Sequence, residues 1–271
     1  MENTNNIFLS IIIPCLNEEK YIGVLLESLK RQSFERYEVI VVDGNSNDRT
    51  REVVSDHCSN FFGESRFSLY EGERGVSKQR NFGARHAKYD HLLFLDADSK
   101  LDVDYLKDFV EELSLSNADI ATAYIWPDSI SPMDWFFWMH ANVLTDLTSY
   151  VWPLGYGMNL YIKKKLFDNI RGFDEDTKVA EDVDLVKRAV AAGGTYAVFK
   201  KPKYFTSVRR LDKEGHLPFF FNTMLIAWQA YRRGGFSRVE VPYEMGHWDG
   251  ELGKEPRTLW EQFKTMMLFW K

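Results

Sequence analysis

Apolar blocks typical of short strands alternate with helix-like segments through the first half of the chain. The alternation runs through predicted strands at 8–13, 37–42 and 92–95 and predicted helices at about 19–32, 48–57 and 104–114. It predicts an α/β fold with a largely parallel sheet and helices on both faces. In such sheets, ligands bind beyond the carboxyl ends of the strands. The polar residues that follow the strands are therefore the first candidates for a functional site.

The strand at 92–95 is followed by two carboxylates, Asp96 and Asp98. Side chains at i and i+2 of extended backbone leave the same face, so these two acids can converge on one target. Hard oxygen ligands suit Mg²⁺ or Mn²⁺, and Mg²⁺ usually completes its coordination with substrate phosphates and water. The pair therefore predicts a cation with a bound diphosphate. A solvated turn with an Asp cap is the alternative, because short motifs often match by chance.

A second polar segment, 43–48, follows the predicted strand at 37–42. A carboxylate at the strand tip, such as Asp43, can accept a hydrogen bond from a nucleobase N–H or a ribose hydroxyl. Asp48 has two interpretations, a ligand contact or the N-cap of the next helix.

Length and composition indicate one large domain with an extension. We predict a transferase domain at 1–215, with a nucleotide-binding half at 1–115 and an acceptor half at 116–215, followed by a helical extension at 216–271. The net charge of −6 disfavours a nucleic-acid partner. Two cysteines cannot form a disulfide framework, which favours a reducing compartment.

The predicted location is cytoplasmic. The first residues lack the basic start of a signal peptide, and no apolar run reaches the roughly 18 residues of a spanning helix. Aromatic residues nevertheless gather at 135–138 and 219–228, and Lys213, Arg232 and Arg233 flank the later group. This pattern predicts a peripheral contact at the inner face of a membrane, with sugar stacking or ordinary core packing as alternatives.

Five short motifs occur in order along most of the chain. They are Pro14-Cys-Leu-Asn-Glu-Glu19, Asp43-Gly-Asn-Ser-Asn-Asp48, Gly75-Val-Ser-Lys-Gln-Arg-Asn81, Asp96-Ala-Asp98, and Gly172-Phe-Asp with Glu181-Asp182. Together they resemble the inverting family 2 glycosyltransferases, which include cellulose and chitin synthases. The resemblance implies a GT-A-type fold, a mostly parallel mixed sheet sandwiched by helices, with a C-terminal helical extension.

The resemblance also implies roles for individual residues. The nucleotide would be bound by Pro14, Asn17, Glu18, Asp43, Arg80 and Asp96, and Asp98 would ligate the metal. Asp182 would be the catalytic base, with Gly157, Met158 and Glu181 beside the donor or acceptor sugar. For Asp182 the alternative is an acid that complements a helix dipole.

Three later residues have weaker assignments. Arg209 and Arg210 could clamp a phosphate through forked hydrogen bonds, although a basic pair is more often a solvated surface. His247 is a candidate metal or substrate contact, although a lone histidine is more often structural.

The predicted function is metal-dependent, inverting transfer of a sugar from a UDP- or GDP-sugar to a glycan or lipid-linked acceptor. A sugar-nucleotide pyrophosphorylase is one alternative, but it would need a basic glycine-rich loop where this chain has the acidic segment 14–19. A catalytically silent nucleotide-sugar-binding protein is another, and the presence of both Asp98 and Asp182 argues against it.

Overall fold

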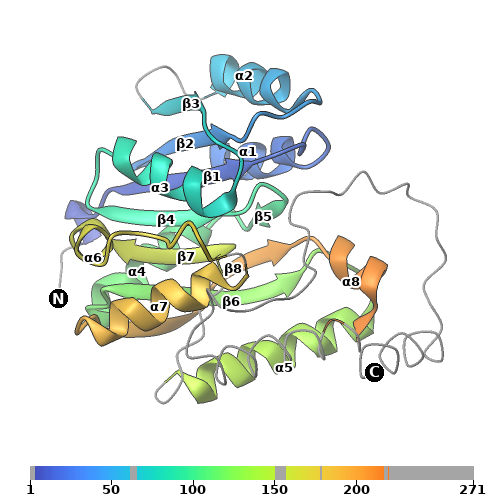
Figure 1. The fold of residues 1–271 in the computed structure, drawn as a ribbon. Helices are drawn as coiled ribbons and strands as arrows, with labels where there is room; N and C mark the ends of the chain where they lie inside the picture. Colours follow the sequence, from blue (N-terminus) through green and yellow to red (C-terminus); the bar gives the residue numbers. More distant parts are fainter. Residues whose placement is uncertain (1–3, 62–65, 150–156, 178, 217–218, 220–271) are drawn as a thin grey trace.

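An eight-stranded mixed sheet forms the centre of the protein (Figure 1). The computed structural model describes residues 4–61, 66–149, 157–177, 179–216 and 219. In chain order the strands are β1 (Leu9–Cys15), β2 (Tyr37–Asp43), β3 (Phe67–Glu71), β4 (His91–Leu95), β5 (Ser99–Leu101), β6 (Ile120–Pro127), β7 (Asn159–Lys163) and β8 (Tyr196–Thr206). Their order in the sheet is β3-β2-β1-β4-β7-β6-β8-β5.

The first four strands pair in parallel, as the strand and helix alternation predicts. β7 is inserted antiparallel between β4 and β6, and β5 pairs antiparallel with β8. β6 and β8 are parallel, with a register shift between Ala123 and Ile125. The sheet is thus mixed, and the carboxyl ends of β1, β2 and β4 lie at one edge.

The helices lie on both faces of the sheet (Figure 1). They are α1 (Ile22–Lys30), α2 (Thr50–Phe61), α3 (Val76–His86), α4 (Tyr105–Ser116), α5 (Pro132–Thr148), α6 (Lys164–Asn169), α7 (Glu181–Ala191) and α8 (Arg209–Glu214), with a 3₁₀ turn at Thr4–Asn6. The predicted helices at 19–32, 48–57 and 104–114 are present with ends shifted by a few residues.

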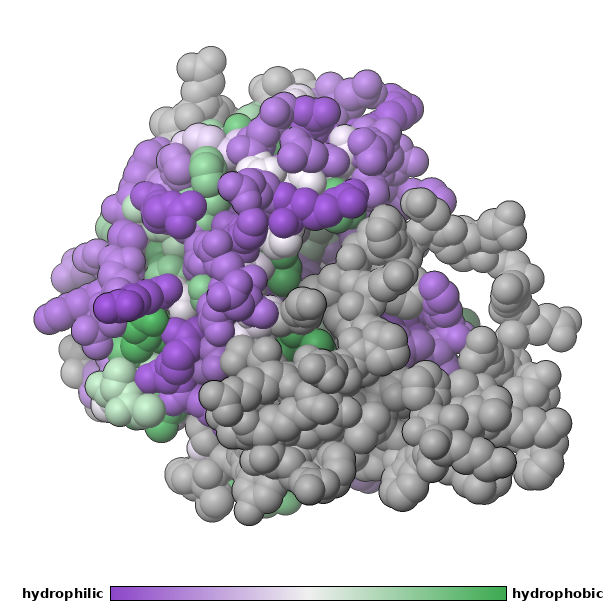
Figure 2. Space-filling model, viewed as in Figure 1, coloured by the Kyte–Doolittle hydropathy of each residue, from purple (hydrophilic) through white to green (hydrophobic). Residues whose placement is uncertain are grey.

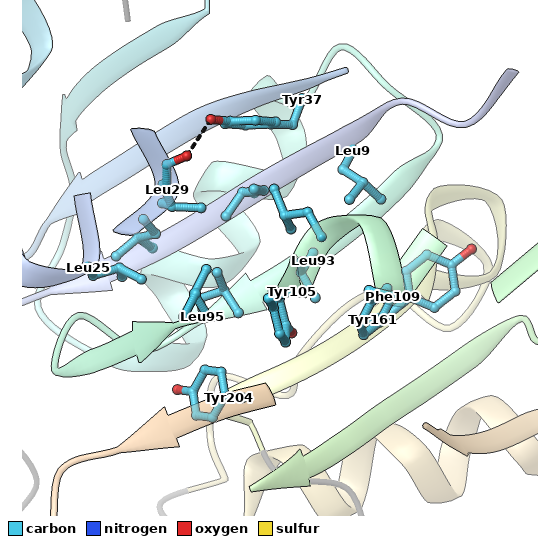
Figure 3. Close-up of a cluster of buried hydrophobic side chains, with 14 of the residues drawn as sticks. Leu9, Leu25, Leu29, Tyr37, Leu93, Leu95, Tyr105, Phe109, Tyr161 and Tyr204 are labelled. Atoms are coloured by element: carbon cyan, nitrogen blue, oxygen red, sulfur yellow. Dashed lines mark hydrogen bonds between the residues drawn. The ribbon is translucent and has the colours of Figure 1, made fainter. Parts of the chain in front are cut away.

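Two apolar cores follow from the alternation of side chains along the buried strands. On one face, α1 and α4 pack against residues such as Leu9, Leu93 and Leu95 (Figure 3). Within that core the Tyr37 hydroxyl donates to the carbonyl of Leu29 at 2.7 Å, which satisfies a buried polar group. On the other face, α3, α6 and α7 cover residues such as Leu92 and Phe94. Burial on both faces explains why these strands are almost continuously apolar.

The surface seen in Figure 2 is largely hydrophilic over α2 and α3. Within the described ranges, we find no helix whose length and hydropathy would let it cross a bilayer. Most of the predicted extension at 216–271, including His247, lies outside the described residues.

Candidate functional site

Three segments meet at the edge formed by the carboxyl ends of β1, β2 and β4. Cys15 at the end of β1 is in register with Asp43 at the end of β2, and the Gly44 N–H donates to the Cys15 carbonyl at 2.9 Å. Pro14 is buried within β1. The predicted convergence of the first, second and fourth motifs at one edge is therefore present.

Asp43 is fully buried and holds the loop that follows β2. Its carboxylate accepts hydrogen bonds from the Ser46 hydroxyl at 2.5 Å and the Ser46 N–H at 3.0 Å. The Ser46 hydroxyl in turn accepts from the N–H of Asn17, which has a left-handed φ of 57°. Left-handed backbone is tolerated by Asn better than by most residues. Sequence reasoning did not single out Ser46, although it links Asp43 to Asn17.

Asp48 lies just before α2. One carboxylate oxygen accepts from the Thr50 N–H at 3.0 Å, and the other accepts from the Glu19 N–H at 3.1 Å. Asp48 lies one residue before the N-cap position, because the Arg49 carbonyl accepts the first helical bond, from the Val53 N–H at 3.0 Å; its carboxylate still satisfies the N–H of Thr50, the first residue of α2.

Arg209, at the start of α8, lies between two acids of the edge. Its guanidinium donates to Asp98 at 2.7 Å and to both oxygens of Glu18 at 3.2 Å, and it stacks over the Tyr21 ring at 4.1 Å. Burial raises the pKa of Glu18 to about 7, against the opposing effect of Arg209. Burial, followed by the charge of Asp96, also raises the pKa of Asp98. Both carboxyls are therefore protonated more readily than exposed acids.

Arg210 has different surroundings. It donates to Glu214 at 2.8 Å within α8, and its guanidinium lies over the Phe219 ring at 5.0 Å. Of the predicted arginine pair, Arg209 contacts Asp98 directly, whereas the contacts of Arg210 are with α8 and Phe219.

Arg80 is buried, with 2% of its surface exposed, and joins two motifs. It donates from one nitrogen to Asp96 and from another to Glu181, each at 2.8 Å, and it lies over the Phe173 ring at 5.2 Å. Charge-assisted bonds of this kind fix geometry strongly in a buried setting. Arg80 therefore ties the acid after β4 to the first residue of α7.

Asp182 follows Glu181 in the first turn of α7 and contacts the glycine loop. It accepts from the Gly157 N–H at 2.6 Å. Burial, and next the charge of Glu181, raises the pKa of Asp182 to about 7. Ala180, directly before the helix, has a left-handed φ of 56°, a conformation that costs energy for a residue with a Cβ atom.

Gly157 has a steric reason to be glycine. A Cβ atom there would lie 2.8 Å from an Arg80 nitrogen and 3.1 Å from Asp182 Cβ. The adjacent Met158 is half-buried, and its carbonyl accepts from the Asp96 N–H at 3.4 Å. Gly157 thus lies beside Arg80 and Asp182, and Met158 lies beside Asp96.

Asn81 connects the motif at 75–81 to that at 172–174. Its side chain donates to the Phe173 carbonyl and accepts from the Phe173 N–H, both at 2.9 Å. Gly172 has a φ of 66°, and a Cβ atom there would lie 2.5 Å from the Asn81 oxygen. Sequence reasoning quoted both motifs but did not predict this contact.

Comparison with known proteins agrees with this arrangement of motifs. The sequence model of the family described as "Glycosyl transferase family 2" matches residues 10–175, which is more than half of the chain. The chain belongs to glycosyltransferase family 2. The predicted family is thereby confirmed.

Among its family 2 relatives is the poly(ribitol-phosphate) beta-N-acetylglucosaminyltransferase TarS of Staphylococcus aureus (strain Mu50). It is 28% identical over 210 residues, which cover 74% of this chain and 35% of TarS. The chain therefore spans about a third of the length of this relative.

Two solved family structures share the fold. The S. aureus TarS fragment 1–349 with UDP-GlcNAc has a TM-score of 0.59 and 25% identity, over 75% of this chain and 59% of the fragment. The mannosyltransferase PcManGT from Pyrobaculum calidifontis, with GDP-Man and Mn²⁺, has a TM-score of 0.67 and 22% identity, over 86% of this chain and 65% of that one. The predicted GT-A-type fold is confirmed.

Proposed function

We propose that this chain is a metal-dependent, inverting glycosyltransferase that moves a sugar from a UDP- or GDP-sugar to a glycan or lipid-linked acceptor. The observation that carries the proposal is the pair of bonds from Arg80 to Asp96 and to Glu181, which supports a shared site for the motif Asp96-Ala-Asp98 and the pair Glu181-Asp182. The bound UDP-GlcNAc of the TarS fragment supports a nucleotide-sugar donor.

Residues 1–115 would bind the nucleotide, through Pro14, Asn17, Glu18, Asp43, Arg80 and Asp96. Residues 116–215 would face the acceptor, with Gly157, Met158 and Glu181 beside the sugars. Arg209 binds the carboxylates of Glu18 and Asp98, and it would turn one of its forked donor pairs to a phosphate. Arg210, the next residue of α8, would contact the same phosphate, whether on donor or acceptor.

A divalent cation, Mg²⁺ or Mn²⁺, fits the acids at this edge. Asp98 has a raised pKa beside Asp96, so a nearby cation would relieve repulsion between the two. Within the described part of the chain no group of three or more acid, His or Cys side chains is arranged as a complete metal cage, so the diphosphate would have to supply further ligands. When bound, the metal would stabilise the charge of the departing nucleoside diphosphate.

Asp182 would remove the proton from the attacking acceptor hydroxyl. With a pKa of about 7 it is deprotonated above neutrality and is still basic enough to accept a proton. Its bond to the Gly157 N–H and the tie from Glu181 to Arg80 would hold the carboxylate in place while the acceptor attacks from the face opposite the leaving group.

The test is Asp182→Asn, with Asp184→Asn as the matched control on the same helix turn. We expect sugar transfer to fall about 10²–10⁴-fold in Asp182→Asn while the thermal shift produced by UDP- or GDP-sugar is unchanged. The control, whose carboxylate pairs with Arg188, should keep its activity. A small effect of Asp182→Asn would indicate a phosphate acceptor, which needs no base.

Two other outcomes would contradict the proposal. Donor binding without release of nucleoside diphosphate in the presence of Mn²⁺ would indicate a silent binding protein. Synthesis of the nucleotide sugar from a sugar phosphate and a nucleoside triphosphate would indicate a pyrophosphorylase.

A further inference from the structure

Helix α5 is oriented with its polar side inward. Its buried residues are Asp134, Trp138, Asn142 and Thr145, three of which are polar. Its exposed positions are Pro132, Met133, Trp135, Phe136, Met139, His140, Val143, Leu144 and Leu147, of which only His140 is polar. This is the reverse of an ordinary surface helix, which turns its apolar stripe toward the core.

Specific hydrogen bonds hold α5 in this orientation. The Asn142 side chain donates to the carbonyl of Ile125 at 2.8 Å and accepts from its N–H at 3.0 Å, at the register shift of β6. Asp134 accepts from the Ser129 hydroxyl at 2.6 Å and is paired with His216 at 2.6 Å. A rotation that buried the apolar side would leave these polar groups without their partners.

The exposed side of α5 is apolar except for His140, which lies between Phe136 and Leu144, and its exposed positions include no Asp, Glu, Lys or Arg. We define the stripe as Met133, Phe136, Met139, Val143, Leu144 and Leu147. At 1.5 Å per residue the helix is about 25 Å long. The two charged residues of α5, which the structure describes from end to end, are Asp134, which is buried and paired with His216, and Asp146, which is partly exposed and paired with Lys200 of β8. Monomeric proteins rarely expose so continuous an apolar surface without a binding role.

The loop before α5 exposes a further apolar side chain. Ile130 is 101% exposed. The first aromatic cluster of the sequence is divided by the helix: Trp138 is buried, whereas Phe136 is 57% exposed. The sequence-based prediction of a membrane contact thus acquires a definite surface.

We infer that the stripe and Ile130 seat the protein on the interface of a lipid bilayer. An isolated protruding side chain such as Ile130 inserts readily into fluid acyl chains, whereas a protein partner would need a matching pocket. The long, flexible Met and Leu side chains suit the same environment. The protein carries a net charge of −6 and the stripe carries none, so attraction to lipid would be hydrophobic and not electrostatic.

This seating would place the candidate site beside the lipid surface. α5 begins a few residues after the carboxyl end of β6, and His216 fastens its first turn to the end of α8, the helix that begins with Arg209. A lipid-linked acceptor would then reach the edge that holds Asp98 from the membrane side. That identification of the acceptor rests on the proposed function, whereas the lipid contact itself does not.

The test is flotation of the full chain with phosphatidylcholine vesicles, with and without phosphatidylglycerol, at low salt and at high salt. We expect the protein to float with both vesicle types and at both salt concentrations. The double variant Phe136→Asp with Leu147→Asp should reduce the floating fraction at least about tenfold, because it puts two charges in the stripe. The control is Leu115→Asp on α4, since Leu115 is 62% exposed outside the stripe and should have no effect.

Three results would overturn the inference. They are a wild-type protein that stays with the soluble fraction, a double variant that floats as well as wild type, and a solution dimer that the double variant converts to monomer. The last would show that a second copy covers the stripe. Circular dichroism checks that the variant is folded. Release of nucleoside diphosphate from the donor in lipid-free buffer tests the proposed function separately from lipid binding.

Discussion

Replacing Arg80 by Met tests the central ion-pair network most directly. The substitution keeps an apolar stem of similar length but removes both 2.8 Å bonds, to Asp96 and to Glu181. Glu181 is itself buried, so its charge loses its compensation. Removing one partner of a buried pair costs about 3–5 kcal/mol. For a chain of this size, roughly 2–4 °C per kcal/mol converts that loss into a fall of about 6–20 °C in the unfolding temperature.

The assay is thermal unfolding followed by circular dichroism, together with the pH dependence of sugar transfer. The cation of Arg80 lowers the pKa of Asp182 against the larger effect of burial, so its removal should move the acid limb of the transfer profile to higher pH. The thermal penalty should also be smaller at acid pH, where the unpaired carboxylates can be protonated.

Two further variants sharpen this prediction. Arg80→Lys keeps the charge but not the fork, so it should lose less stability than Arg80→Met. Arg31→Met removes a pair with Glu27 in which the arginine is 71% exposed, and should change the free energy of unfolding by at most about 1 kcal/mol. An Arg80→Met protein that unfolds within 2 °C of wild type would refute the reasoning.

Three other predictions concern the same edge. Asp182 must be unprotonated to act as base, and its pKa is about 7. The value of kcat/KM should therefore fall about tenfold per pH unit below that pKa and level off above it. A flat profile from pH 5.5 to 8.5 would exclude this role. Gly157→Ala places a Cβ atom 2.8 Å from an Arg80 nitrogen. It should lower the rate of sugar transfer about 10–100-fold, because a displacement of catalytic groups by about 1 Å can lower a rate about 100-fold. Circular dichroism should show little loss of secondary structure. Chelation by EDTA should stop release of nucleoside diphosphate, and added Mn²⁺ should restore it in wild type but not in Asp98→Asn; full activity after chelation would contradict the metal role.

Much of the fold could be predicted from the sequence because its central strands are unusually clear. The strands at 37–42 and 92–95 are buried on both faces, so they are apolar apart from the buried Glu38, and their ends are marked by polar residues. Because polar segments directly follow these strands, the sequence also predicts that Asp43, Asp96 and Asp98 lie at one edge of the sheet.

Other elements could not be predicted because their stabilising contacts are distant in sequence. β7 is only five residues long and is held by antiparallel pairing with β4, more than 60 positions earlier. β8 continues through the polar residues 200–203 because its second half pairs with β5 and with the end of β6. The roles of Ser46 and Asn81 likewise depend on hydrogen bonds across loops, which no local pattern reveals.

The neighbouring residues Arg80 and Asn81 connect α3 to three other segments of the chain. The Arg80 side chain donates hydrogen bonds to Asp96 and Glu181, and the Asn81 side chain donates one to the backbone carbonyl of Phe173. A small tilt of this single helix would therefore displace the acid after β4, the start of α7 and the Gly172 turn together. Directed evolution toward another donor or acceptor would then be expected to yield compensating changes in α3 and in these three segments together. A single substitution in α3 alone would be rare.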